Sequence, residues 1–148
     1  MKALSLIFFF TFIAGCNDRQ GAKTFSTSVS GNHVSITLVY DDDKVLKQTS
    51  ESKIMFSSLN VTTKEEAAKL LTPLSAKYQN ISGVDQRVVY KEDWVEEHVS
   101  IDMTRVDFSK LPSLPGTMTS GESLKGVDSV SLKKTEALLE GAGFKETK

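Results

Sequence analysis

Cysteine is nearly absent from this sequence, since Cys16 is the only one among 148 residues. A disulfide within one chain needs two cysteines, so none forms inside a monomer. Any metal site would also lack the pair of thiolates that many structural zinc sites use. The single thiol therefore calls for a different explanation, which depends on the residues around it.

Long hydrophobic runs and an excess of charge of one sign are also missing. The longest apolar stretch, residues 3–14, has 12 residues, whereas a helix that spans a bilayer needs ~20. The net charge is −1, and lysines and carboxylates alternate along the chain. This pattern argues against a nucleic-acid partner or a basic membrane-binding surface. We also expect no cofactor.

The residues before Cys16 have the layout of a signal peptide. Lys2 precedes the apolar stretch, and the small residues Ala14 and Gly15 follow it. The segment "IAGC" at residues 13–16 resembles the lipobox of bacterial lipoproteins. The resemblance implies that the Cys16 thiol carries diacylglycerol and that the chain is cleaved between Gly15 and Cys16. The alternatives are an ordinary secretory signal near a chance cysteine, or a free buried cysteine.

A lipid on Cys16 would place the protein on a membrane. Stable attachment takes more than one acyl chain, and a diacylglyceryl group supplies two. Asn17, rather than Asp, follows the cysteine, which favours an outer membrane facing the periplasm in a Gram-negative host, although Asp18 weakens this inference. In a Gram-positive host the location would be the outer face of the cytoplasmic membrane. The expected partner is the membrane itself, and we expect a monomer.

Three segments follow from this layout. Residues 1–15 are the predicted signal peptide, and residues 16–23 are the lipidated cysteine and a polar, flexible tether. Residues 24–148 are predicted to form one domain, because the 133 residues that follow the signal peptide have the size of a single domain. No internal repeat is visible.

Alternation of apolar and polar residues predicts strands. Three lie in residues 23–31, 33–41 and 44–56, with Gly31 and Asn32 as the turn of the first hairpin. Two more lie in residues 84–91 and 94–103. Three consecutive strands joined by short connections predict an antiparallel meander.

Helical spacing appears in two segments. In residues 62–81, Thr63 and Glu66 form a capping box, and Pro73 is expected to kink the helix. A second helix is predicted in residues 131–144, with Ser131 as N-cap and Gly143 in a left-handed ending. The expected fold is α+β: a meander-type antiparallel sheet of about five strands with two main helices packed on one face.

Several segments together resemble a known family. These are the lipobox, "KVLKQTSE" at 44–51, "TTKEEAAKLLTPLSAKYQNISGV" at 62–84, "VSIDM" at 99–103 and "GAGFKE" at 141–146. They resemble the YehR-like family of bacterial lipoproteins across essentially the whole chain after the signal. The resemblance implies a compact α+β domain on a lipid anchor, and it implies no catalytic residues.

One strand carries residue types of a hydrolase triad. Glu96, His98, Ser100 and Asp102 share the polar face of the strand in residues 94–103. Neighbours two apart on a strand are separated by about 6.6–6.8 Å, too far for a direct bond from nucleophile to base. No G-x-S-x-G motif occurs. We therefore predict no catalytic residues and no enzymatic activity.

Metal sites are also disfavoured. Asp41, Asp42 and Asp43 are adjacent and lead directly into Lys44, which does not give the spaced oxygen ligands of a calcium loop. His33 and His98 occupy outward strand positions and could approach each other on one sheet face, but they lack a ligand spacing. We predict no metal site.

Trp94 has two possible positions. It lies opposite Val95 and Val99 on its strand, so it is either exposed as a contact residue or closes the core under residues 112–116.

The predicted function is a non-enzymatic binding or interaction module of a lipid-anchored envelope protein, using a sheet face or loops. The possible binding residues are Trp94, His98 and His33. The alternative is a lipoprotein that binds a small ligand or metal beside a transporter or sensor.

Overall fold

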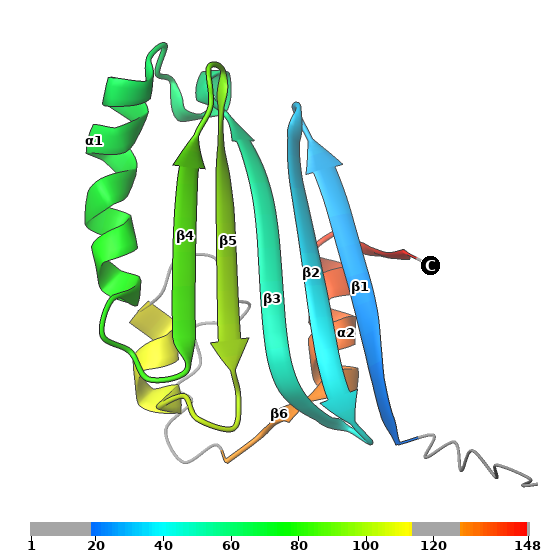
Figure 1. The fold of residues 1–148 in the computed structure, drawn as a ribbon. Coiled ribbons are helices and arrows are strands. Elements are labelled where there is room, and N and C mark those ends of the chain that lie inside the picture. Colours follow the sequence, from blue (N-terminus) through cyan, green and yellow to red (C-terminus); the bar gives the residue numbers. More distant parts are fainter. Residues whose placement is uncertain (1–18, 114–127, 148) are drawn as a thin grey trace, which may run out of the picture.

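A seven-stranded antiparallel sheet forms the body of the protein (Figure 1), which this computed structural model describes for residues 19–113 and 128–147. The strand order is β4-β5-β3-β2-β1-β7, and β6 pairs with β3 beside this path. The strands are β1 (Gln20–Val29), β2 (Asn32–Asp41), β3 (Lys44–Met55), β4 (Val84–Tyr90), β5 (Trp94–Asp102), β6 (Val130–Ser131) and β7 (Lys145–Thr147).

The α+β class is confirmed, but the prediction of about five strands was incomplete. The five predicted strands correspond to β1–β5, and β1, β2 and β3 form the expected meander. β6 and β7 have only two and three residues, which is too short for an alternating pattern to be recognised.

The sheet begins earlier in the chain than the sequence predicted. Gln20 already pairs with Asp41, so residues 20–23, which were assigned to the tether, belong to β1. They are polar and contain Gly21, but their pairing with β2 orders them. The predictions for Cys16 and the signal peptide fall on residues 1–18, outside the described part of the chain.

The first hairpin turns one residue earlier than expected. Ser30 and Gly31 both have positive φ, at 52° and 81°, as a two-residue turn of type I′ requires. Asn32 is the first residue of β2 and pairs with Val29. Its side-chain oxygen accepts a hydrogen bond from the Met55 backbone at 2.8 Å, which ties the turn to the end of β3.

Both predicted helix starts are confirmed. The Thr63 hydroxyl accepts from the Glu66 backbone at 3.2 Å, and α1 runs over Lys64–Ser75. Ser131 accepts from the Lys134 backbone at 3.3 Å, and α2 runs over Leu132–Gly141. Short 3-10 turns are η1 (Phe56–Leu59), η2 (Ala76–Tyr78) and η3 (Phe108–Ser113).

The helix ends also have identifiable causes. Pro73 lies in the last turn of α1, which passes directly into η2. Gly143, at φ 86°, follows α2, and the Phe144 backbone donates to Leu139 at 3.0 Å, which is the predicted Schellman-type ending. None of the described helices has the length and apolar character needed to cross a membrane.

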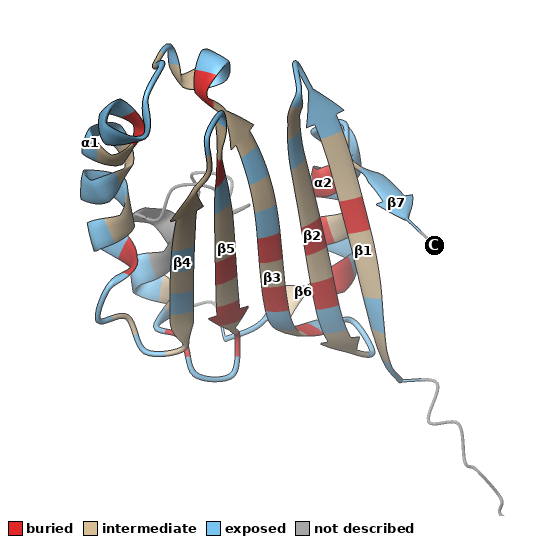
Figure 2. Cartoon of the chain, turned by 45° about the horizontal axis from the view of Figure 1, so that its top comes forward, coloured by how far each residue is buried: buried red, intermediate tan, exposed pale blue. Residues whose placement is uncertain are grey.

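The helices cover the sheet only in part. α2 packs behind β1 and β2, where Leu132 and Leu139 join the main core cluster. α1 lies along β4, and its Ala67 joins a second, smaller cluster with Phe56 and Val95. Buried residues are concentrated in the middle of the central strands and on α2 (Figure 2). The prediction of two main helices packed on one face was therefore not exact, because α1 and α2 each cover a different part of the sheet.

The acidic triplet connects the meander to α2. The Asp43 carboxylate accepts hydrogen bonds from the Lys133 backbone at 2.9 Å and the Ser131 hydroxyl at 2.8 Å. Both bonds hold the pKa of Asp43 below its usual value, and the bond from the Lys133 backbone has the larger effect. Asp42, in contrast, makes an exposed ion pair with Arg19 at 3.9 Å.

We predict that Asp43→Asn lowers the free energy of unfolding at pH 7 and flattens its pH dependence in acid. The folded-state pKa of Asp43 is depressed, so its ionised form stabilises the fold above the unfolded pKa, and this stability is lost as the pH falls through the folded pKa. Urea unfolding between pH 7 and pH 2 measures the effect. Asp42→Asn is the matched control and should change little; equal effects of the two variants would contradict the capping role.

Candidate functional site

An irregularity in β3 decides which of its side chains face the core. Val39 pairs with Lys47, and Tyr40 pairs with Val45, so Leu46 is an extra residue in β3. Such a bulge reverses the alternation of faces along the strand. As a result Val45 is fully buried before the bulge, and after it the even-numbered residues face the core, with Gln48 and Ser50 buried and Ser52 half-buried.

Those even-numbered residues place a polar stripe on the core face. We define the stripe as Gln48, Ser50 and Ser52 of β3. Gln48 is 6% exposed and Ser50 is 8% exposed. Within the described residues, no hydrogen bond is formed by any of these three side chains, although buried polar groups in proteins are nearly always paired. None of their side-chain nitrogen or oxygen atoms is both fully buried and unpaired, so these donors and acceptors remain accessible from the open space above the sheet.

A carboxylate lies next to the stripe. Glu97 sits on β5 between the buried residues Val95 and Val99, and it pairs in register with Ser52 of β3. The Gln86 side-chain amide of β4 donates a hydrogen bond to Glu97 Oε1. Glu97 thus projects from the core face of the sheet, where a charged residue is unusual.

The hydroxyl of Tyr78, in η2, is affected by the negative charge of Glu97. Its side chain is 3% exposed. Burial raises the pKa of the Tyr78 hydroxyl far above its usual value, and the negative charge of Glu97 raises it further. The phenol therefore stays neutral beside the Glu97 carboxylate.

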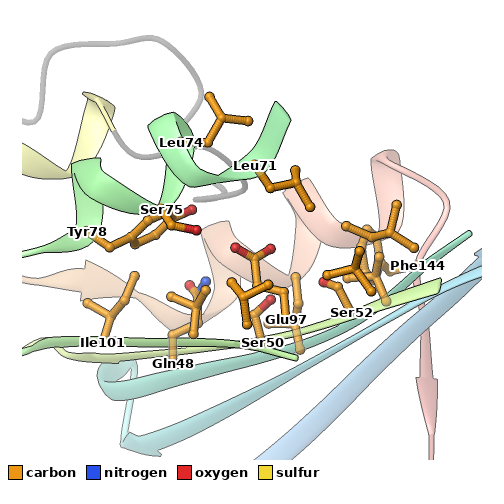
Figure 3. Close-up of a pocket in the computed structure, with 16 residues that line it drawn as sticks. Gln48, Ser50, Ser52, Leu71, Leu74, Ser75, Tyr78, Glu97, Ile101 and Phe144 are labelled. Atoms are coloured by element: carbon orange, nitrogen blue, oxygen red, sulfur yellow. The ribbon is translucent and has the colours of Figure 1, made fainter. Parts of the chain in front are cut away.

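These groups line a cavity of about 400 Å³ between the sheet and the helices (Figure 3). The stripe and Glu97 project from the floor, Leu71, Leu74 and Ser75 of α1 form one wall, and Phe144 after α2 closes the opposite side. The remaining lining is mostly apolar and comes from the strands and η2: Val34, Ile36, Ile54, Tyr78, Val88, Val95, Val99 and Ile101.

The size and lining are those of a small-molecule site. Ligand pockets typically measure about 300–1,000 Å³ and combine an apolar lining with a few polar groups that fix orientation. Here the apolar walls would hold a hydrophobic body, and the stripe and Glu97 would orient it.

The residues favoured from sequence lie on the other face of the sheet, which we call the open face. His33 and His98 line one shallow depression there, together with Arg87, Glu51 and Lys53. His33 Nδ1 forms a hydrogen bond with the Ser28 hydroxyl at 2.9 Å, and His98 Nδ1 lies 3.7 Å from Glu51. β3 separates the two histidines, because β2 and β5 are its two neighbours.

No group of three potential metal ligands occurs among residues 19–113 and 128–147. Asp43 and Asp42 are engaged in the cap and the ion pair described above. Asp102 accepts a hydrogen bond from the Thr104 hydroxyl at 2.6 Å. In the described structure, no hydrogen bond connects His98 to Ser100, so the triad residues share a face without forming a triad.

Trp94 lies on the open face and is half-buried there. Its indole N–H donates to Glu96 at 3.1 Å, and the Lys53 ammonium lies 4.5 Å from the ring centre. The indole and Lys91 both lower the pKa of Glu96, the indole more strongly. The alternative placed Trp94 under residues 112–116, of which 114–116 lie outside the described part of the chain.

Sequence reasoning missed the cavity residues. One signal was present, because Glu97 falls in the alternating set of Val95, Val99 and Ile101, where an apolar residue is expected. The polar centre of β3 was visible too. The sequence did not show that this polar centre lies on the core face, because its orientation depends on the bulge at Leu46.

Comparison with known proteins places the chain among uncharacterised relatives. Residues 21–145 match the family described as "Protein of unknown function (DUF1307)". The uncharacterised lipoprotein YehR of Escherichia coli K12 is 46% identical over 136 residues, covering 92% of this chain and 88% of that protein. The uncharacterised lipoprotein Lin0239 of Listeria innocua is 39% identical over 134 residues, with coverage of 90% and 86%.

A solved structure confirms the fold. The NMR structure of Escherichia coli YehR superposes with a TM-score of 0.75 at 44% identity, and the match covers 89% of this chain and 94% of that one. The expected resemblance to the YehR-like family is thus confirmed.

We predict that Ser50→Val stabilises the domain by ~1 kcal/mol, because it adds apolar surface on the core face where the hydroxyl has no described partner. Urea unfolding measures this change. Ser100→Val, near the end of β5 on the open face, is the control and should stay within about 0.5 kcal/mol. A loss of stability in Ser50→Val would show that the hydroxyl supports the fold.

Proposed function

The chain belongs to the DUF1307 family of proteins of unknown function, and we propose that it is a lipid-anchored envelope protein whose domain binds a small, largely apolar ligand. The proposed site is the cavity between the polar stripe, Glu97 and the two helices. We further propose that the protein binds without catalysing a reaction and acts as a monomer.

The anchor is supported by the lipobox at residues 13–16 and by the names of its relatives. YehR and Lin0239 are both called lipoproteins. β1 starts at Gln20, only four positions after Cys16, and a chain of that length spans at most about 14 Å. The domain would therefore be held close to the membrane, on its outer-membrane periplasmic side in a Gram-negative host and on the outer face of the cytoplasmic membrane otherwise.

We predict that Cys16→Ser abolishes lipid attachment and releases the protein from the membrane fraction, because the thiol is the acceptor of diacylglycerol. Mass spectrometry of the purified N-terminus, together with fractionation, measures both effects. A Cys16→Ser protein that still carries lipid in the membrane fraction would exclude Cys16 as the acceptor.

One observation carries the ligand-binding proposal. Gln48 and Ser50 are more than nine-tenths buried, line the cavity and have no hydrogen-bond partner among the described residues. Their polar atoms are accessible from the cavity, so a ligand there can supply the hydrogen-bond partners that the described residues do not. This favours the small-ligand alternative over an interaction through the open face, where the charged side chains already pair with one another.

We predict that the domain binds the neutral fluorescent probe N-phenyl-1-naphthylamine saturably, since the probe is apolar and small enough for such a cavity. Fluorescence titration measures the binding. Ser75→Trp fills the cavity from α1 and should abolish saturable binding, whereas Thr72→Trp on the exposed side of the same helix should not. Equal binding by both variants, each verified as folded by circular dichroism, would contradict the site.

A further inference from the structure

The charge of the cavity identifies the ligand more closely. We infer that the ligand is a small amphipathic amine whose ammonium group pairs with the Glu97 carboxylate while its apolar body fills the rest of the cavity. This inference rests on the proposed function, since it concerns the same site.

Glu97 carries the only formal charge among the described residues that line the cavity. None of the sixteen lining residues is a lysine, arginine or histidine. The positively charged residues of the neighbouring strands, such as Lys53 and Arg87, line the depression on the open face. The cavity is therefore electrically complementary to a cation and repels an anion.

The surroundings of Glu97 fit an ammonium group in particular. Gln86 on β4 donates to Oε1 and fixes the carboxylate from one side. On the other side, Ser52 is the register partner of Glu97, and Ser50 is the partner of Val99. An ammonium group has three N–H donors, and the Glu97 carboxylate, the stripe hydroxyls and the Gln48 amide oxygen all accept. Figure 3 shows these groups projecting from the floor into the same space.

The apolar surroundings strengthen this pairing. Charge-assisted hydrogen bonds are about twice as strong as neutral ones, and a low local dielectric strengthens them further. A half-buried carboxylate without a cation is costly in the same environment. A ligand cation would thus contribute more to affinity here than on the water-exposed open face.

The walls accept the rest of such a ligand. Ile54, Leu71, Leu74 and Phe144 contribute apolar side chains above and beside the floor. Leu74 is still 37% exposed, so apolar surface at this wall remains available for contact with a ligand. An alkyl or aromatic body attached to the amine would cover it.

Three probes of equal chain length test the inference. Octylammonium, octanol and octanoate differ only in head group, and at pH 7 the amine is protonated, as a lysine side chain is. Isothermal titration at concentrations below micelle formation gives each affinity. We expect octylammonium to bind roughly tenfold more tightly than octanol, and octanoate to bind most weakly.

Glu97→Gln should remove the preference for octylammonium over octanol, because glutamine keeps the shape and still accepts from Gln86 but carries no negative charge. Glu96→Gln, one residue earlier on the open face, is the matched control and should retain the preference.

The outcomes separate this inference from the proposed function. Equal affinities for the three probes in the wild-type protein, or a preference that persists in Glu97→Gln, would overturn the ammonium assignment and leave the cavity as a site for neutral ligands. Failure of all three probes and of N-phenyl-1-naphthylamine would overturn the proposed function as well. The wild-type comparison does not depend on any variant folding.

Discussion

The extra residue at Leu46 is the constraint on which the arrangement of this domain depends. Val45 must be buried, and without the bulge the same face would continue with Lys47, Glu51 and Lys53, whose burial without partners is prohibitively costly. The bulge instead turns the polar stripe inward. The Leu46 carbonyl accepts from the Met103 backbone at 2.9 Å, outside the β2–β3 pairing, so the irregularity is itself held in place.

A polar stripe in the centre of the core face divides the core. The larger apolar cluster lies beneath α2, and the smaller one lies near α1, with the stripe and Glu97 between them. Polar groups at this position cannot be covered by apolar helix residues without leaving their hydrogen bonds unsatisfied. The separation of the two helices and the cavity between them therefore follow from the same few residues of β3 and β5.

The two faces of the sheet use their charges differently. On the open face, Glu96 is paired with Lys91 at 3.2 Å, Glu51 lies beside His98, and Lys53 covers the ring of Trp94. On the core face, Glu97 has an amide donor in Gln86 but no cation among the described lining residues. Adjacent glutamates on one strand thus have different chemistry, because alternation places one in water and the other in a cavity.

Local sequence alone determined most of the elements. The five long strands, the N-caps Thr63 and Ser131 and the ending at Gly143 each depend on a few neighbouring residues, so periodicity and capping rules predicted them. The sequence also excludes a disulfide within one chain, because Cys16 is its only cysteine. Only the tertiary structure decided which polar residues lie on the core face and line the cavity. The face of Gln48, Ser50 and Ser52 depends on a bulge that pairing with β2 creates, and the importance of Glu97 depends on Gln86, Tyr78 and two helices that converge from distant parts of the chain.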